Sequence, residues 1–159
     1  MSTAAFEDPP QTDRFSGESP TTVIRLSSSA EHLLECAEQE PNYATTVVRG
    51  ALLDTGATSN FIQRSFLPTG TEVIPWSLRD HGGPSFVGVL GKPFKTDGTC
   101  RLYAMLAGRP PVELTFVVNH GISDRVILGI PAIQALGVTI DVKSRTIRFA
   151  SGGAAVDYV

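Results

Sequence analysis

The chain has 159 residues, of which 42% are hydrophobic and 18% are charged, a length and composition typical of one globular domain with a tail. Its longest weakly polar run, residues 126–138, is interrupted by Gly129, Pro131 and Gln134, so it falls short of the roughly 20 apolar residues of a membrane span. The formal net charge is −3 and the sequence has no basic run, which argues against nucleic acid as the main partner.

The N-terminal sequence has neither the basic nor the apolar segment of a secretory signal, and the cysteines are Cys36 and Cys100 alone. These two cysteines suggest no disulfide framework. We therefore expect a reducing, cytoplasmic environment and no membrane partner.

Residues 1–42 differ in charge from the remainder of the chain. They carry eight acidic and two basic residues, a net charge of −6, whereas residues 43–159 carry eight acidic and eleven basic residues, a net charge of +3. Residues 1–29 are also rich in Ser, Thr and Pro, a composition that predicts disorder. We interpret residues 1–42 as an acidic, largely disordered leader.

A short helix is expected within this leader, near residues 29–39. Ser28 and Glu31 have the spacing of a capping box, and Leu33, Leu34 and Ala37 then give an apolar stripe.

From residue 43 onward, short apolar runs alternate with Gly, Pro and Asp-Gly, which is typical of strands. The expected strands are Ala44–Val48, Ala51–Leu53, Glu72–Trp76, Phe86–Leu90, Cys100–Leu106, Val112–Val118, Val138–Val142 and Thr146–Phe149. The pattern predicts an all-β domain over residues 43–149, with a flexible tail over residues 150–159.

One stretch departs from the strand pattern, near the C-terminal end. Pro131 suits the first turn of a helix, Ile133 and Leu136 repeat at a helical spacing, and Gly137 is a good C-terminal stop. We expect one short helix there.

The most informative segment begins with Asp54, an acidic residue at the end of an apolar run. Leu52 and Leu53 place its carboxylate at a buried strand end, where an ionised group is costly unless it is hydrogen-bonded or used. Gly56 allows a sharp turn that brings backbone amides back toward the acid, and Thr55 supplies a hydroxyl beside it. The pattern indicates a constructed carboxylate site.

The string Leu-Leu-Asp-Thr-Gly-Ala-Thr over residues 52–58 resembles the active-site signature of the retropepsin-type aspartic proteases, and its continuation through Asn60 and Phe61 resembles the gypsy-type retrotransposon version. A second element of that family, two hydrophobic residues and a glycine, is matched by Ile127, Leu128 and Gly129. In the family this element crosses near the catalytic loop and completes a ψ-shaped core. The resemblance implies a closed-barrel-like acid protease lobe with one C-terminal helix.

The resemblance also implies roles for individual residues. Asp54 is the catalytic acid, Thr55 and Gly56 support the active-site loop, and Gly56, Ala57 and Thr58 contact the substrate. A Gly-rich hairpin that closes over the substrate is matched best by residues 86–92, so Val89, Leu90 and Gly91 are expected to contact the substrate. Retroviral members usually carry an acidic residue and an arginine that pair with each other at the positions of Thr58 and Ile130.

Peptide hydrolysis by carboxylates needs two of them sharing one proton, because one accepts a proton from water while the other donates to the carbonyl oxygen. No other aspartate of this sequence is followed by Thr-Gly or Ser-Gly. A homodimer with both Asp54 side chains at its axis would supply the pair. The resulting hypothesis is an aspartic endopeptidase that needs no cofactor, cuts extended segments with flanking hydrophobic residues, and processes a polyprotein.

Two other interpretations stay open. The domain could be a catalytically silent module for dimerisation or peptide binding. Alternatively, Asp-Thr-Gly could be an ordinary turn in a monomeric β-domain, since Asp and Gly are favoured turn residues. No metal is expected, because His32, His81 and His120 lack metal-ligand spacing and the sequence has neither a His-Glu-x-x-His motif nor paired Cys-x-x-Cys motifs.

Overall fold

The computed structural model describes residues 19–35, 44–77, 83–88, 91–120 and 125–159. Its strands within these ranges are β1 (Thr21–Ser27), β2 (Thr45–Leu53), β3 (Asn60–Gln63), β4 (Ile74–Pro75), β5 (Phe86–Val87), β6 (Pro93–Phe94), β7 (Thr96–Leu106), β8 (Val112–Asn119), β9 (Val126–Leu128), β10 (Val138–Asp141), β11 (Thr146–Phe149) and β12 (Val156–Asp157). The helices are α2 (Ala30–Glu35), the 3-10 turn η2 (Arg64–Phe66) and α3 (Ile130–Leu136). Neither described α-helix is long and apolar enough to cross a membrane.

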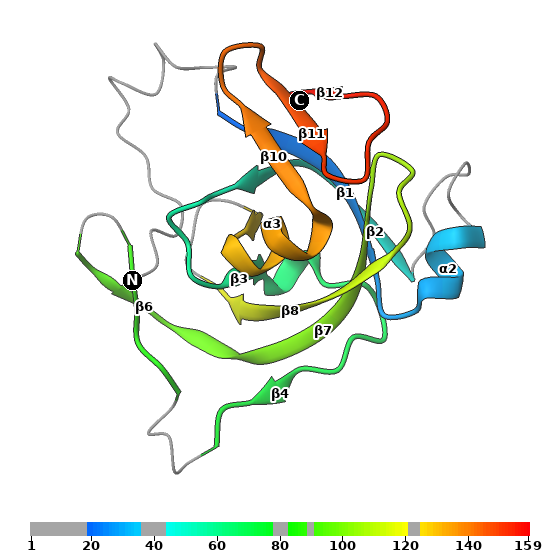
Figure 1. The fold of residues 1–159 in the computed structure, drawn as a ribbon. Coiled ribbons are helices and arrows are strands. Elements are labelled where there is room, and N and C mark those ends of the chain that lie inside the picture. Colours follow the sequence, from blue (N-terminus) through cyan, green and yellow to red (C-terminus); the bar gives the residue numbers. More distant parts are fainter. Residues whose placement is uncertain (1–18, 36–43, 78–82, 89–90, 121–124) are drawn as a thin grey trace.

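Six strands close into a barrel, in the order β1, β2, β9, β3, β8 and β7, with β7 pairing back to β1 (Figure 1). Two of the pairings are parallel, β2 with β9 and β3 with β8, and the others are antiparallel. Strand β4 extends the sheet beyond β7. The prediction of a mostly β, closed-barrel-like domain is confirmed.

The barrel encloses one main core, because alternate residues of each long strand point inward. On β7 the inward set is Cys100, Leu102 and Ala104, each at most 1% exposed. Burial raises the pKa of the Cys100 thiol to about 11, so this thiol stays protonated, as expected of a small buried apolar residue.

Strand β1 corrects the prediction of disorder for residues 21–27. Thr21–Ser27 pairs with β2 on one side and with β7 on the other, and therefore closes the barrel. Its side chains alternate, with Thr22, Ile24 and Leu26 buried inside. The short helix predicted near residues 29–39 begins at Ala30 and is described as far as Glu35. Residues 1–18 and 36–43 of the leader lie outside the described residues.

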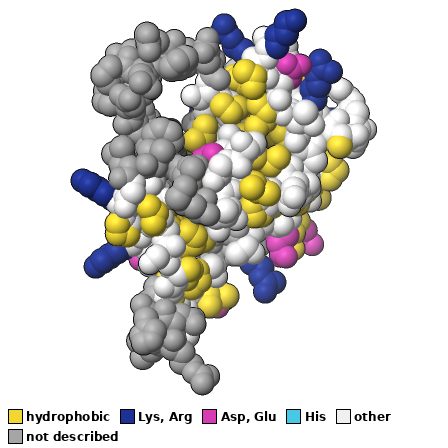
Figure 2. All heavy atoms as spheres, turned by 60° about the vertical axis from the view of Figure 1, so that its left-hand side comes forward, with side chains coloured by type: hydrophobic (Ala, Val, Ile, Leu, Met, Phe, Trp, Pro, Cys, Tyr) yellow, Lys and Arg dark blue, Asp and Glu magenta, His cyan; other side chains and the backbone are white. Residues whose placement is uncertain are grey.

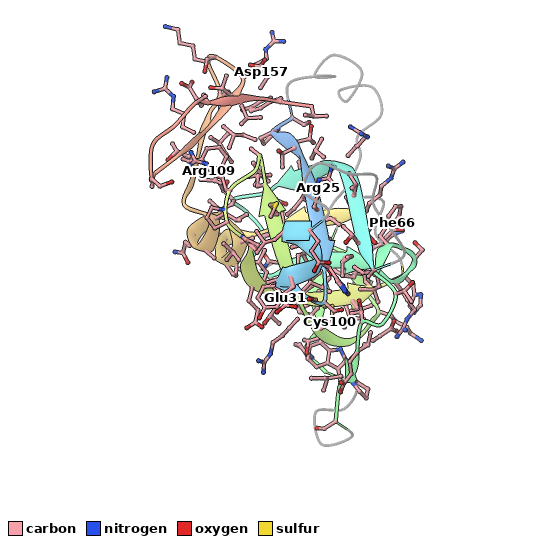
Figure 3. All side chains as sticks on the ribbon, turned by 90° about the vertical axis from the view of Figure 1, so that its right-hand side faces the viewer. Arg25, Glu31, Phe66, Cys100, Arg109 and Asp157 are labelled. Carbon is pink, nitrogen blue, oxygen red and sulfur yellow. The ribbon has the colours of Figure 1, made fainter. Side chains whose placement is uncertain are left out.

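The predicted flexible tail, residues 150–159, also differs from the structure. Val156–Asp157 forms β12 on the edge of the β10–β11 hairpin, and the Val159 N–H donates to the Thr21 carbonyl at 3.0 Å. Arg109 donates to the Ser151 hydroxyl at 3.1 Å and to the Gly152 carbonyl. Figure 3 shows Arg109 and Asp157 near the same end of the molecule, so this tail packs on the barrel.

Of the remaining strand predictions, Thr146–Phe149 matches β11 at both ends, and the others hold with shifted limits. Ala44–Val48 and Ala51–Leu53 are parts of the single strand β2, and Glu72–Trp76 is reduced to the two-residue strand β4. Within the expected strand Phe86–Leu90, Phe86–Val87 forms β5, and residues 89–90 lie outside the described residues. Helix α3 has Pro131 in its first turn and ends at Gly137, which adopts the left-handed conformation (φ 63°, ψ 41°). Its sequence-predicted start and stop are therefore confirmed.

We predict that Ile24→Ala lowers the free energy of unfolding by about 2–5 kcal/mol, because Ile24 is fully buried and a cavity would remain in the core. Leu34→Ala is the matched control, since Leu34 is 60% exposed and its loss should change stability by less than about 0.5 kcal/mol. Urea unfolding of both variants provides the measurement. Equal effects of the two substitutions would show that β1 lies outside the cooperative core.

Candidate active site

Asp54 follows the last residue of β2, and backbone contacts fix its position. Its N–H donates to the Leu128 carbonyl of β9 at 2.9 Å. The side chain is half-buried, and its Oδ1 accepts a hydrogen bond of 2.8 Å from the Gly56 N–H. The sequence-based expectation that the turn returns an amide to this carboxylate is confirmed.

The rest of the loop faces outward on one side and inward on the other. Thr55, Gly56 and Thr58 are exposed, whereas Ala57 is fully buried. The Ala57 N–H donates to the Asp54 carbonyl at 3.1 Å and closes the turn. In a single chain, the residues next to the carboxylate are therefore accessible to another molecule.

Gly129 crosses directly beside this loop, and only a glycine fits there. A Cβ built on Gly129 would lie 2.2 Å from the Ser59 carbonyl oxygen and 2.7 Å from that of Ala57. The next residue, Ile130, donates its N–H to the Ala57 carbonyl at 2.9 Å. The sequence-based expectation that residues 127–129 cross near the Asp54 loop is confirmed.

Asn60 joins three segments around the loop, and sequence reasoning missed this role. Its Oδ1 accepts hydrogen bonds from the N–H groups of Gly129 (2.9 Å) and Ala132 (3.2 Å). Its Nδ2 donates to the Thr115 carbonyl of β8 at 3.0 Å. Asn60 is 2% exposed, and a buried amide needs hydrogen-bond partners. The sequence signal for this role is a polar residue at the start of the otherwise apolar run Asn-Phe-Ile.

The expected hairpin forms, although only part of it is described. Strand β5 pairs with β6, and the Gly88 N–H donates to the Lys92 carbonyl at 3.1 Å. Gly91 is exposed, with φ at 79°. Val89 and Leu90, which were expected to contact substrate, lie outside the described residues.

An aromatic cluster ties this hairpin to the strand that follows the Asp54 loop. The Phe61 ring of β3 meets those of Phe86 and Phe94 edge-on, with centroids 5.1 and 5.7 Å apart. The same cluster contains the buried side chains of Ala57 and Ile127. Such contacts favour a hairpin packed over the loop. Figure 2 shows hydrophobic side chains in a band on this side of the molecule, with Lys and Arg mostly near its outline.

A groove of about 440 Å³ begins beside the loop. We call it the side groove. Its walls come from the loop, the β4–β5 segment, the β7–β8 sheet and α3, and are formed by Ser59, Asn60, Trp76, Pro84, Phe86, Thr99, Glu113, Leu114, Thr115, Val117, Pro131 and Ala135.

A small charged cluster joins η2 and the residue after β8 to the start of β7. Asp97 of β7 accepts a hydrogen bond from the Arg64 Nε at 2.9 Å, and its Oδ2 lies 2.7 Å from the His120 Nε2. His120 is exposed, as expected of a surface histidine. Among the residues that the structure describes, no three metal-ligating side chains gather at one place.

Thr58 and Ile130 occupy the two positions at which the resemblance to retroviral proteases leads one to expect an acidic residue and an arginine. Thr58 and Ile130 are both uncharged, and Ile130 is 39% exposed. The Ile130 N–H nevertheless bonds the Ala57 carbonyl. The start of α3 is therefore tied to the loop by a backbone contact that does not need the charged pair.

No protein-family model matches the chain. No curated protein matches it either. Among solved structures, the chain is similar to a crystal structure of the retroviral protease-like domain of Ddi1 from Leishmania major, with 12% sequence identity and a TM-score of 0.48 over 87% of this chain and 91% of that one.

We predict that Asn60→Ala lowers the free energy of unfolding by at least about 2 kcal/mol, because it leaves two buried N–H groups and a carbonyl without their partner. Ser59→Ala is the control: this neighbouring side chain is half-buried, and we expect a change of less than about 0.5 kcal/mol. Chemical denaturation measures both. A loss no greater for Asn60→Ala than for Ser59→Ala would contradict the assigned role.

Proposed function

We propose that this protein is an aspartic endopeptidase that hydrolyses peptide bonds in extended polypeptide segments with flanking hydrophobic residues. One observation carries the proposal. The Asp54 carboxylate is held by the Gly56 N–H at 2.8 Å, at the edge of an exposed Thr55–Gly56 turn that a crossing glycine fixes from behind. An ordinary surface turn does not require a second segment, such as the one at Gly129, to pack against its backbone.

The proposed site is completed by a second copy of the chain, because each chain supplies one Asp54. In the homodimer, both carboxylates lie at the two-fold axis and share one proton. The exposure of Thr55 and Gly56 is consistent with a partner loop on this face. Thr55 then hydrogen-bonds across the axis and locks the two loops together.

The proposed reaction uses a water molecule between the two carboxylates. The ionised Asp54 accepts a proton from the water, whose oxygen bonds to the carbonyl carbon, while the protonated Asp54 donates its proton to the carbonyl oxygen. The tetrahedral gem-diol then breaks its C–N bond: the protonated Asp54 donates its proton to the amine that leaves, while the ionised Asp54 accepts a proton from one hydroxyl group, which forms the carboxylic acid product and restores the shared proton. No acyl-enzyme forms and no cofactor takes part.

The remaining proposed roles concern the peptide backbone and pocket. The Gly56 carbonyl accepts a hydrogen bond from the substrate backbone, and the exposed Thr58 lines the pocket beside it. Ala57, which the sequence also predicted to contact substrate, is fully buried and instead packs beneath the loop with Phe61 and Ile127. The hairpin, including Gly91, covers the bound peptide and excludes water. Polyprotein processing, a retrotransposon origin and a cytoplasmic location stay predictions from the sequence.

We predict that Asp54→Asn abolishes cleavage of a diverse peptide mixture, because an amide can neither accept nor hold the shared proton. Asp157→Asn, an exposed substitution on β12, should cleave like the wild type. Mass spectrometry of the digests, with the oligomeric state of each protein recorded, gives the answer. A folded wild-type dimer that cleaves nothing would instead support a silent binding module, and a monomer that tolerates Asp54→Ala in all assays would support an ordinary turn.

We also predict that cleavage is fastest below pH 7 and declines at higher pH, since the reaction needs one ionised and one protonated carboxylate. The measurement is kcat/KM for one cleaved peptide across pH 3–9, alongside circular dichroism to exclude unfolding. A rate that still rises through pH 9 would rule out the shared-proton mechanism.

A further inference from the structure

The side groove gives the proposed protease a surface for substrate residues beyond those at the scissile bond, a role that rests on the proposed function. Ser59 and Asn60, which begin the groove, come directly after the Asp54 loop. Phe86 of the hairpin also lines the groove. The side groove therefore adjoins both the end of the loop and the hairpin.

The far part of the groove is reached along β8. The Asn60 amide donates to the Thr115 carbonyl, and Glu113 lies two residues before Thr115 on the same outer face of the strand. Two strand residues span about 7 Å. Glu113 is thus placed for an outer residue of an extended peptide, away from the bond that is cut.

Glu113 is the charged residue among the described side chains that line the groove. It is exposed, and none of the ion pairs within the described ranges involves it. Tyr103 lies opposite Glu113 on β7, and the nearest arginine in the sheet register, Arg101, lies opposite Thr115. No ion pair between Arg101 and Glu113 occurs in this part of the structure.

The walls of the side groove are largely apolar. Trp76 and Phe86 present aromatic surfaces, and Val117 and Leu114 of β8 add aliphatic ones. A long basic side chain fits such a surface, because its methylene stem packs on apolar groups while its charged end reaches a carboxylate. An acidic side chain would meet a like charge.

We propose that Glu113 is a specificity-determining residue that favours substrates with Lys or Arg at an outer position, several residues from the scissile bond. Because the ion pair is partly exposed to solvent, the expected preference is modest, about two- to fivefold for Lys over Gln. The preference should weaken as the salt concentration rises.

The test uses the full-length dimer and one cleaved peptide, in which Lys, Gln or Glu is placed in turn at each outer position. The expected wild-type result is a higher kcat/KM for Lys at one position, with Glu the poorest residue there. In Glu113→Gln the Lys-to-Gln ratio should fall to near one, and in Glu113→Lys the preference should reverse toward Glu. Glu31→Gln on α2, outside the groove, should keep the wild-type ratio.

A second readout separates this inference from the proposed activity. Binding of the same fluorescent peptides to the Asp54→Asn protein gives the Lys-to-Gln ratio of Kd values without any cleavage. If the wild type cleaves nothing yet binding favours Lys and loses this preference in Glu113→Gln, the protease proposal fails and the assignment of Glu113 stands. A Lys preference at no position, or one that persists in Glu113→Gln, overturns the assignment of Glu113.

Discussion

The close passage of Gly129 beside the backbone of residues 57–59 is the contact on which the site depends. Side chains are excluded there, since a Cβ would fall 2.2 Å from the Ser59 carbonyl oxygen. Two segments about seventy residues apart in sequence can therefore share hydrogen bonds, including those to Asn60. The crossing fixes both the turn that orients the Asp54 carboxylate and the start of α3.

The features that the sequence predicted are those with a local signal. Asp54 follows an apolar run and precedes Gly56. This pattern indicates a hydrogen-bonded carboxylate, because an ionised group at a buried strand end is costly without such bonds. Pro131 and Gly137 mark the ends of α3 through their backbone preferences alone. Strands β2, β7, β8, β10 and β11 show clear apolar runs, so their existence could be predicted. The limits of β11 could be predicted as well, whereas those of β2 and β7 could not.

The features that escaped prediction depend on partners distant in sequence. Thr22, Ile24 and Leu26 alternate as a strand should, but their Ser- and Thr-rich surroundings outweighed that pattern, and only pairing with β2 and β7 orders the segment. In the sequence, Asn60 is typical of a surface residue. Its buried position follows only from its hydrogen bonds with Gly129, Ala132 and Thr115, which are distant in sequence. The C-terminal tail is likewise ordered by Arg109 and Thr21. The amino-acid composition of a segment reports only how well that segment dissolves in water by itself. The order of β1, Asn60 and the tail depends instead on contacts with distant residues, which form only when the barrel closes.

The central claim is that two chains contribute one Asp54 each to a single site. Its most direct test mixes wild-type protein with Asp54→Asn at constant total concentration, allows the subunits to exchange, and measures cleavage as a function of the wild-type fraction. If both carboxylates are required, activity follows the square of that fraction, so an equal mixture retains about one quarter of the rate. A linear decline, with about one half retained, would show that one chain holds the whole catalytic site and would contradict the account.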